Sequence, residues 1–317
     1  MTTETQILDE VIAASRRRIM TMGGAALATL FVGGATRANA QSTLTDTDYL
    51  NFALNLEYLE ANFYTLAATG MTISQAGIGT GPGTAVTGGG TVTVKPGGPA
   101  ACQVPFAINY VQSYAAEIYA EEQKHVTFLR SALGSSAVAQ PNIDLYNSFN
   151  AAAAAAGIAP SFDPFANDVF FLLGSYIFED VGVTAYHGAA GLLTDSANLV
   201  PAVGIQAVEA YHAGLIRTAL WGLDQQDPAI GIAGITAQIS ALRAKLDGTN
   251  NDDIGLTTAQ VALNTTTANF TASTIVNADA NTIAFSRTPQ QVLNIVYASP
   301  TGVKGGFYPN GLNGNIG

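Results

Sequence analysis

The chain has 317 residues and a formal net charge of −11 at pH 7, with 48% hydrophobic and only 11% charged residues. This acidic balance argues against nucleic acid as a partner, because binding to phosphates needs a basic surface. Cys102 is the only cysteine, which excludes an intramolecular disulfide and a thiolate metal cluster. We expect its thiol to be buried.

The first forty residues are typical of an export signal. Residues 16–18 are arginines that precede a Gly/Ala-rich apolar run, 22–35, and Ala38-Asn39-Ala40 has the form of a cleavage site. The pattern resembles a twin-arginine signal, and the run is shorter than the ~20 residues of a membrane span. We therefore expect 1–40 to be a twin-arginine signal peptide. The mature chain would be periplasmic or extracellular, without a membrane span.

The first predicted helix begins at Asp46 as its cap and runs to about Ala68, where Gly70 ends it. A Gly/Thr-rich insertion, 70–104, follows this helix. Within it, residues 91–94 form the only alternating, strand-like piece, which predicts a loop with a short hairpin.

Three more long helices are predicted from apolar residues at helical spacing, over 106–133, 167–193 and 202–223. The connection between the first two of these is long and contains a short predicted helix, 145–156. Such a connection fits the crossover between the second and third helices of some four-helix bundles.

The C-terminal extension, 226–317, has a different composition. It contains an amphipathic helix near 236–246, then a Thr/Asn-rich stretch, 249–281. Thr288 as cap and Pro289 at the first helical position predict one more short helix.

Two copies of a Glu-x-x-His motif lie in the second and fourth predicted helices. Glu122 precedes His125, and Glu209 precedes His212. Residues three apart on a helix share a face, so each motif directs a carboxylate and an imidazole at one point, where they can bind a metal ion. An arginine follows each histidine five residues later, so the two copies form an internal repeat.

The first and third helices carry a second repeated pair, a Glu followed seven residues later by a Tyr. These pairs are Glu57 with Tyr64 and Glu179 with Tyr186. Seven residues is close to two turns, so each pair shares a face.

This order of Glu helices and Glu-x-x-His helices matches the di-iron and di-manganese carboxylate bundles. Over 46–223 the sequence resembles the ferritin-like superfamily, and more closely its exported ferritin-like-domain branch, which includes desiccation-related proteins. The resemblance implies an all-α, ferritin-like four-helix bundle in 41–225, with the C-terminal extension packed on it. It implies these metal ligands: Glu57, Glu122, His125, Glu179, Glu209 and His212. Tyr64 and Tyr186 would each lie one hydrogen bond from a ligand carboxylate.

Three neighbouring residues compete for a role at this site. Glu60 also shares a face with Tyr64, but the repeated Glu-to-Tyr spacing favours Glu57 as the ligand. Glu121 points about 100° away from Glu122, so we expect a solvated charge or a charge at the rim. We expect His187 to be structural or to lie near the site.

Carboxylates with two imidazoles suit two iron ions, with manganese as the alternative. The resemblance implies oxidation of ferrous iron or consumption of peroxide, so the expected partners are metal ions and oxygen or peroxide. Two other hypotheses are a desiccation-protective structural protein with a vestigial or stabilising metal site, and a manganese catalase-like enzyme. The sequence leaves open whether the site turns over and whether the chain forms a homo-oligomer.

Overall fold

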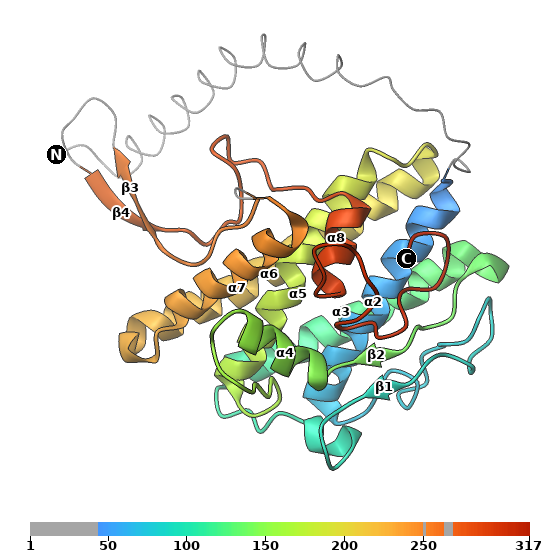
Figure 1. Cartoon of the computed structure of the whole chain (residues 1–317), viewed down its shortest axis with the longest axis horizontal. Coiled ribbons are helices and arrows are strands. Elements are labelled where there is room, and N and C mark those ends of the chain that lie inside the picture. The colour runs from blue at the N-terminus through green and yellow to red at the C-terminus, as the bar shows by residue number, and fades with distance from the viewer. Residues whose placement is uncertain (1–43, 250–251, 263–268) are drawn as a thin grey trace, which may run out of the picture. The chain divides into compact units, whose positions relative to one another are not determined.

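Four long helices carry the fold: α2 (Asp46–Thr69), α3 (Asn109–Leu133), α5 (Asp168–Ala190) and α6 (Ser196–Gln226) (Figure 1). In this computed structural model, which describes residues 44–249, 252–262 and 269–317, α2 packs against α3 and α5 packs against α6. Further contacts between α2 and α5 and between α3 and α6 join the two pairs. The predicted all-α, ferritin-like four-helix bundle is therefore confirmed. The segment predicted to be a signal peptide lies outside the described residues.

Two helix starts differ from the prediction. Helix α2 is capped by Thr45, whose backbone N–H donates to the Asp48 carboxylate at 2.7 Å, rather than by Asp46. Asp46 instead accepts hydrogen bonds from the backbone N–H groups of Thr194 and Asp195, just before α6. Helix α6 begins at Ser196 rather than near residue 202. We expected the helix to start after Pro201, but this proline lies within the first two turns and does not interrupt the helix.

The predicted hairpin in the insertion is wrong. Strand β1 (Val92–Thr93) pairs in parallel with β2 (Ile143–Asp144), which belongs to the crossover after α3. Alternation of side chains indicates a strand but does not identify its partner. The insertion also contains a 3-10 helix, η1 (Pro99–Cys102), and the Cys102 thiol is buried as expected.

The crossover between α3 and α5 is confirmed. It contains the 3-10 helix η2 (Gly134–Ser136), strand β2 and the short helix α4 (Asn147–Ala155).

Beyond α6, the described residues form η3 (Pro228–Ile230), α7 (Ile232–Asp247), the antiparallel strands β3 (Thr258–Ala262) and β4 (Asn269–Ser273), and α8 (Pro289–Val296). The β3–β4 pair was not predicted. Both strands alternate polar and apolar residues, but we considered only the Thr/Asn-rich composition of this stretch. Helix α8 begins as predicted, with Thr288 as its cap and Pro289 at its first position.

Helix α2 is buried on all sides, and every residue from 50 to 67 is inaccessible to solvent or nearly so. Asparagines on this helix bind the backbone of the segments that cover it. Asn51 donates to Ser136 O at 2.9 Å, and Asn55 donates to Asn313 O at 2.9 Å. Tyr308 also donates to Asn55 O at 2.8 Å. The crossover and the C-terminal tail therefore cover a helix that would otherwise expose a large apolar surface.

The arginines of the internal repeat each hold one appended segment. Arg130 donates to the carbonyl oxygens of Gly81, Gly83 and Ala85 in the insertion at 2.7 to 2.8 Å. Arg217 is buried and forms an ion pair with Asp180 at 2.9 Å. It also donates to backbone carbonyls of the C-terminal extension, which are those of Ile254, Thr274 and Ile275.

Two of the described helices are long and apolar enough to satisfy a length-and-composition criterion for a membrane span, namely α5 and α6. In the apolar window of α5, 83% of the residues are buried, as in the core helix of a soluble protein. In α6 this share is 33%, and its charged residues are all buried: Glu209 inside the bundle, and Arg217 and Asp224 against the C-terminal extension. The apolar residues of α5 are therefore explained by the burial of this helix inside the protein.

Replacing Arg217 tests how firmly the extension is held. Arg217→Met removes the donor to three partly buried backbone carbonyls and one ion pair of Asp180. We expect the metal-free protein to lose on the order of 3 kcal/mol of unfolding free energy, measured in urea. The control is Lys124→Met, because Lys124 is exposed on α3. Equal stability of the two variants would contradict the inferred role of Arg217.

Candidate metal centre

All six predicted ligands lie inside the bundle. Helix α2 contributes Glu57, α3 contributes Glu122 and His125, α5 contributes Glu179, and α6 contributes Glu209 and His212. None is more than 8% exposed. The structure therefore brings together every side chain that the sequence nominated.

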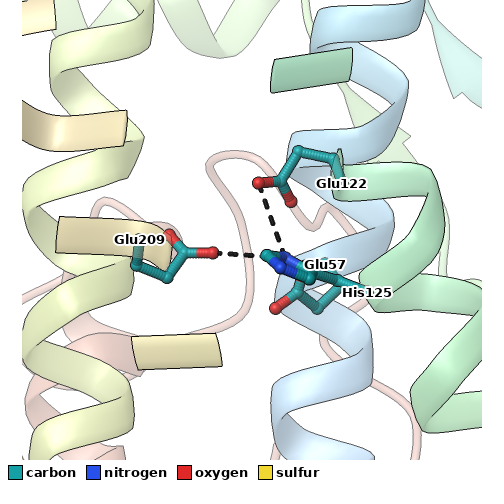
Figure 2. Close-up of side chains that lie close together, drawn as sticks. All are labelled: Glu57, Glu122, His125 and Glu209. Atoms are coloured by element: carbon teal, nitrogen blue, oxygen red, sulfur yellow. Dashed lines mark ion pairs between the residues drawn. The ribbon is translucent and has the colours of Figure 1, made fainter. Parts of the chain in front are cut away.

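The first donor group contains Glu57, Glu122, His125 and Glu209, whose donor atoms lie within 4.8 Å of one another. His125 Nδ1 lies 3.2 Å from Glu57 Oε2 and 3.6 Å from both Glu122 Oε1 and Glu209 Oε1. Figure 2 shows the Glu122 and Glu209 carboxylates pointing toward the His125 ring from opposite sides of the bundle.

The second donor group contains Glu122, Glu179 and His212. His212 Nδ1 lies 3.1 Å from Glu122 Oε1 and 3.5 Å from Glu179 Oε2. Glu122 belongs to both groups, and its Oε1 atom lies between the two histidines, 3.6 Å from His125 Nδ1 and 3.1 Å from His212 Nδ1. This is the arrangement that a pair of metal ions bridged by one carboxylate requires.

Many of the donor atoms in these groups are buried without a hydrogen-bond partner in the part of the chain that the structure describes. Each of the six side chains has at least one buried oxygen or nitrogen with no hydrogen-bond partner among the described residues. A buried polar atom without a partner costs roughly 1 to 3 kcal/mol, and more when it is charged. The unpaired atoms face one another across a short distance, which fits a positively charged group bound between them.

The buried charges shift the pKa values of the site in opposite directions. Burial raises the pKa of Glu57 to about 7, and burial together with Glu122 raises the pKa of Glu209 well above its usual value. Burial alone lowers the pKa of His125, but Glu57 outweighs burial and raises it to about 12. For Glu122, burial raises the pKa, but the neighbouring His125 and His212 imidazoles outweigh burial and hold the pKa well below its usual range.

Two tyrosines connect the halves of the bundle crosswise. Tyr64 on α2 donates to Glu179 on α5, and Tyr186 on α5 donates to Glu57 on α2. Each tyrosine therefore leaves the other oxygen of its carboxylate facing the donor groups. The predicted contacts of Tyr64 and Tyr186 with ligand carboxylates are present.

Glu121 corrects one expectation. We expected a solvated charge or a charge at the rim, and its side chain is indeed 35% exposed, yet its carboxylate accepts from His212 Nε2 at 2.8 Å. A carboxylate on one ring nitrogen fixes the tautomer and directs the other nitrogen toward the donor group. Sequence reasoning did not predict this contact, because Glu121 lies on α3 and His212 lies on α6. In the repeat, Val208 stands where the first copy has Glu121, so His125 has no equivalent partner on α6.

The other two neighbours lie outside both donor groups. Glu60 is buried beside the site and belongs to neither group, which agrees with the choice of Glu57. His187 Nδ1 lies 3.0 Å from the backbone oxygen of Phe285, so it joins α5 to the C-terminal extension.

Comparison with known proteins agrees with this geometry. Residues 45–221 match the ferritin-like domain family. The chain belongs to this family. This ferritin-like protein is 30% identical over 257 residues to the desiccation-related protein PCC13-62 of Craterostigma plantagineum, which covers 78% of this chain and 76% of that protein. It is 29% identical over 283 residues to the ferritin-like catalase Nec2 of Nesocodon mauritianus, which covers 86% of this chain and 84% of that protein. No solved structure matches it significantly.

The shifted pKa values predict opposite pH dependence with and without metal. In the metal-free protein, the pKa of Glu57 rises from 4.5 to about 7 on folding, so its contribution is complete below pH 4.5 and is lost as pH rises through 7. The raised pKa of His125 acts in the same direction, from its unfolded value of 6.5 up to about 12. We therefore expect metal-free protein to lose on the order of 2 to 3 kcal/mol of stability from Glu57 alone between pH 5 and about 8, and more with His125.

Metal-loaded protein should not follow this decline, because metal binding requires deprotonated carboxylates and strengthens as pH rises. Melting temperatures measured from pH 5 to about 8, before and after chelation, give the comparison. Parallel curves for the two forms would count against a metal bound by these residues.

Glu121 gives a separate prediction about His212. We expect Glu121→Ala to weaken metal affinity by about 10- to 100-fold, because His212 loses the group that orients its ring. Affinity is measured by competition with a chelator. The matched control is Glu117→Ala, since Glu117 is an exposed carboxylate on the same helix. If both variants bind metal equally well, Glu121 does not orient His212.

Proposed function

We propose that this chain binds two metal ions and uses them to consume peroxide or to oxidise ferrous iron. One observation carries the proposal: the six converging side chains have buried donor atoms without partners, and Glu122 is shared between two donor groups. The proposed ligands are Glu57, Glu122, His125 and Glu209 for one ion, and Glu122, Glu179 and His212 for the other.

Iron is the first choice for these ions, and manganese is the alternative. The donor groups supply carboxylate oxygens and imidazole nitrogens, which both metals accept in divalent form. They contain no thiolate, which would favour zinc or copper(I), since Cys102 lies in the insertion.

The protein contributes to the chemistry by holding these donor side chains in place and by limiting the access of water. Tyr64 and Tyr186 orient two of the carboxylates, and Glu121 orients His212. Bound iron or manganese would supply the exchange of electrons with peroxide or oxygen. The buried donors need little rearrangement to bind the metal, because their surroundings already fix them.

The name of one relative, a ferritin-like catalase, supports consumption of peroxide as the preferred reaction. The name of the other, a desiccation-related protein, supports a protective role in which metal only stabilises the bundle. Purified protein separates these alternatives, because only the first requires peroxide consumption above that of the free metal ion.

Export is also part of the proposal. The family match begins at residue 45, which leaves the predicted signal peptide outside the ferritin-like domain. Replacing the three arginines at 16–18 with lysine should retain the chain in the cytoplasm, and N-terminal sequencing of the exported form should begin at Gln41. Export that does not depend on these arginines would contradict a twin-arginine signal.

Replacing the histidines tests the metal centre and its activity together. His125→Gln and His212→Gln keep the side-chain bulk but remove an imidazole ligand. We expect each to lose bound metal and to lower peroxide consumption on the order of 100-fold, with helicity by circular dichroism retained. Elemental analysis of the wild type should find about two metal ions per chain.

The matched control is His187→Gln, because the His187 ring contacts Phe285 O and lies outside both donor groups. It should retain metal and activity. The proposed function fails if wild-type protein loaded with iron or manganese consumes peroxide and oxidises ferrous iron no faster than the free ion.

A further inference from the structure

An apolar cavity of about 190 Å³ lies beside the bundle, between α4, α5, α7 and α8. Its walls include Phe149, Ala153, Ile177, Ile239, Ile295 and Phe307. Arg243 is the only charged residue in the lining, and its guanidinium is already paired with Asp180 and Asp253. The cavity therefore offers little to an ion or to a strongly polar molecule.

A second, smaller cavity of about 20 Å³, here called the inner cavity, adjoins the first, and nearly all of its lining residues are buried. The two cavities share Ile177, Ile295 and Phe307 as walls. The inner cavity is large enough for about one water molecule. Its only charged wall is Glu60. The three shared side chains therefore form the constriction between the outer cavity and Glu60.

Glu60 has no structural partner that explains its burial. It is only 5% exposed, and its carboxylate makes no hydrogen bond or ion pair among the described residues. Gly182 on α5 is the point where Glu60 approaches the metal centre. A Cβ at Gly182 would collide with Glu209 Oε2 and would lie 3.4 Å from Glu60 Oε1. Glycine is therefore required there, and the inner cavity, which Gly182 also lines, ends beside a proposed ligand.

We propose that the two cavities form an access route along which a small neutral molecule, such as hydrogen peroxide, reaches the metal centre, with Glu60 as the polar group at its inner end. This inference rests on the proposed function. The apolar walls select against a hydrated divalent cation, because shedding its water between Ile177, Ile295 and Phe307 would be costly. A small uncharged molecule has no such penalty and finds a hydrogen-bond acceptor in Glu60.

The alternative path to the site passes the edge of His125, whose side chain is 10% exposed. The exposed carboxylate of Glu121 lies on the neighbouring side of the donor groups, at His212. A polar edge of this kind suits metal ions better than the apolar cavities do. Substitutions that narrow only the apolar cavities distinguish between these two paths.

The test measures how fast nitric oxide binds to protein loaded with ferrous iron, by stopped-flow spectroscopy. Nitric oxide is small and neutral, and its binding does not require turnover. We expect Ile295→Trp to slow association on the order of tenfold, and Ile295→Ala to leave it unchanged or faster. The control is Val200→Trp, because Val200 is exposed on α6 and lines neither cavity. Iron content is measured for each variant.

Ile295→Phe serves as a second narrowing variant if Ile295→Trp does not fold, because overpacking a core is itself destabilising. Crystals of the wild type under xenon pressure give a readout without iron, since apolar cavities bind xenon. Xenon should lie against Ile177, Ile295 and Phe307, and Ile295→Trp should remove it.

The outcomes separate the route from the proposed function. If nitric oxide binds wild type and the narrowed variants at equal rates, the route is wrong, and access past His125 replaces it, whether or not peroxide is consumed. If Ile295→Trp slows nitric oxide while the wild type leaves peroxide untouched, the route stands and the proposed activity fails. A wild type that binds neither iron nor manganese overturns both.

Discussion

The burial of four carboxylates at the centre of one bundle is the constraint on which the rest of the structure depends. Glu57, Glu122, Glu179 and Glu209 are each at most 1% exposed, and their ionic partners among the described residues are only the two histidines. Two imidazolium charges cannot balance four carboxylates, and removing such charges from water costs several kcal/mol for each. Either protons or metal ions must make up the difference, and the raised pKa of Glu57 shows how strongly the metal-free site draws protons.

The surroundings of the site follow from this constraint. Helix α2, which carries Glu57, is also buried on its other sides, because the crossover and the C-terminal tail cover it. The repeated arginines show how the covering segments are held: Arg130 binds the insertion and Arg217 binds the extension. The ligands thus repeat closely between the halves, whereas the groups around them have diverged. Glu121 supports only His212, and the apolar cavities approach only from the side of Glu60.

The ligand set was predictable because its information is local. Spacings of three and seven residues place Glu122 with His125, and Glu57 with Tyr64, on shared helix faces whatever the tertiary packing. Features that depend on partners distant in sequence were not predictable in this way. The strand around Val92 was visible, but its pairing with Ile143 was not. Glu121 pointed away from the ligands of its own helix, and only the packing of α3 on α6 brings it to His212.

Anomalous diffraction from crystals of protein purified with its own metal tests the central claim most directly. Data collected across the iron and manganese absorption edges locate each ion and identify its element. The account predicts two peaks on either side of Glu122, one among Glu57, His125 and Glu209 and the other between Glu179 and His212. A fully folded protein with no peak inside the bundle, and with Glu122 hydrogen-bonded to the two histidines instead, would contradict it.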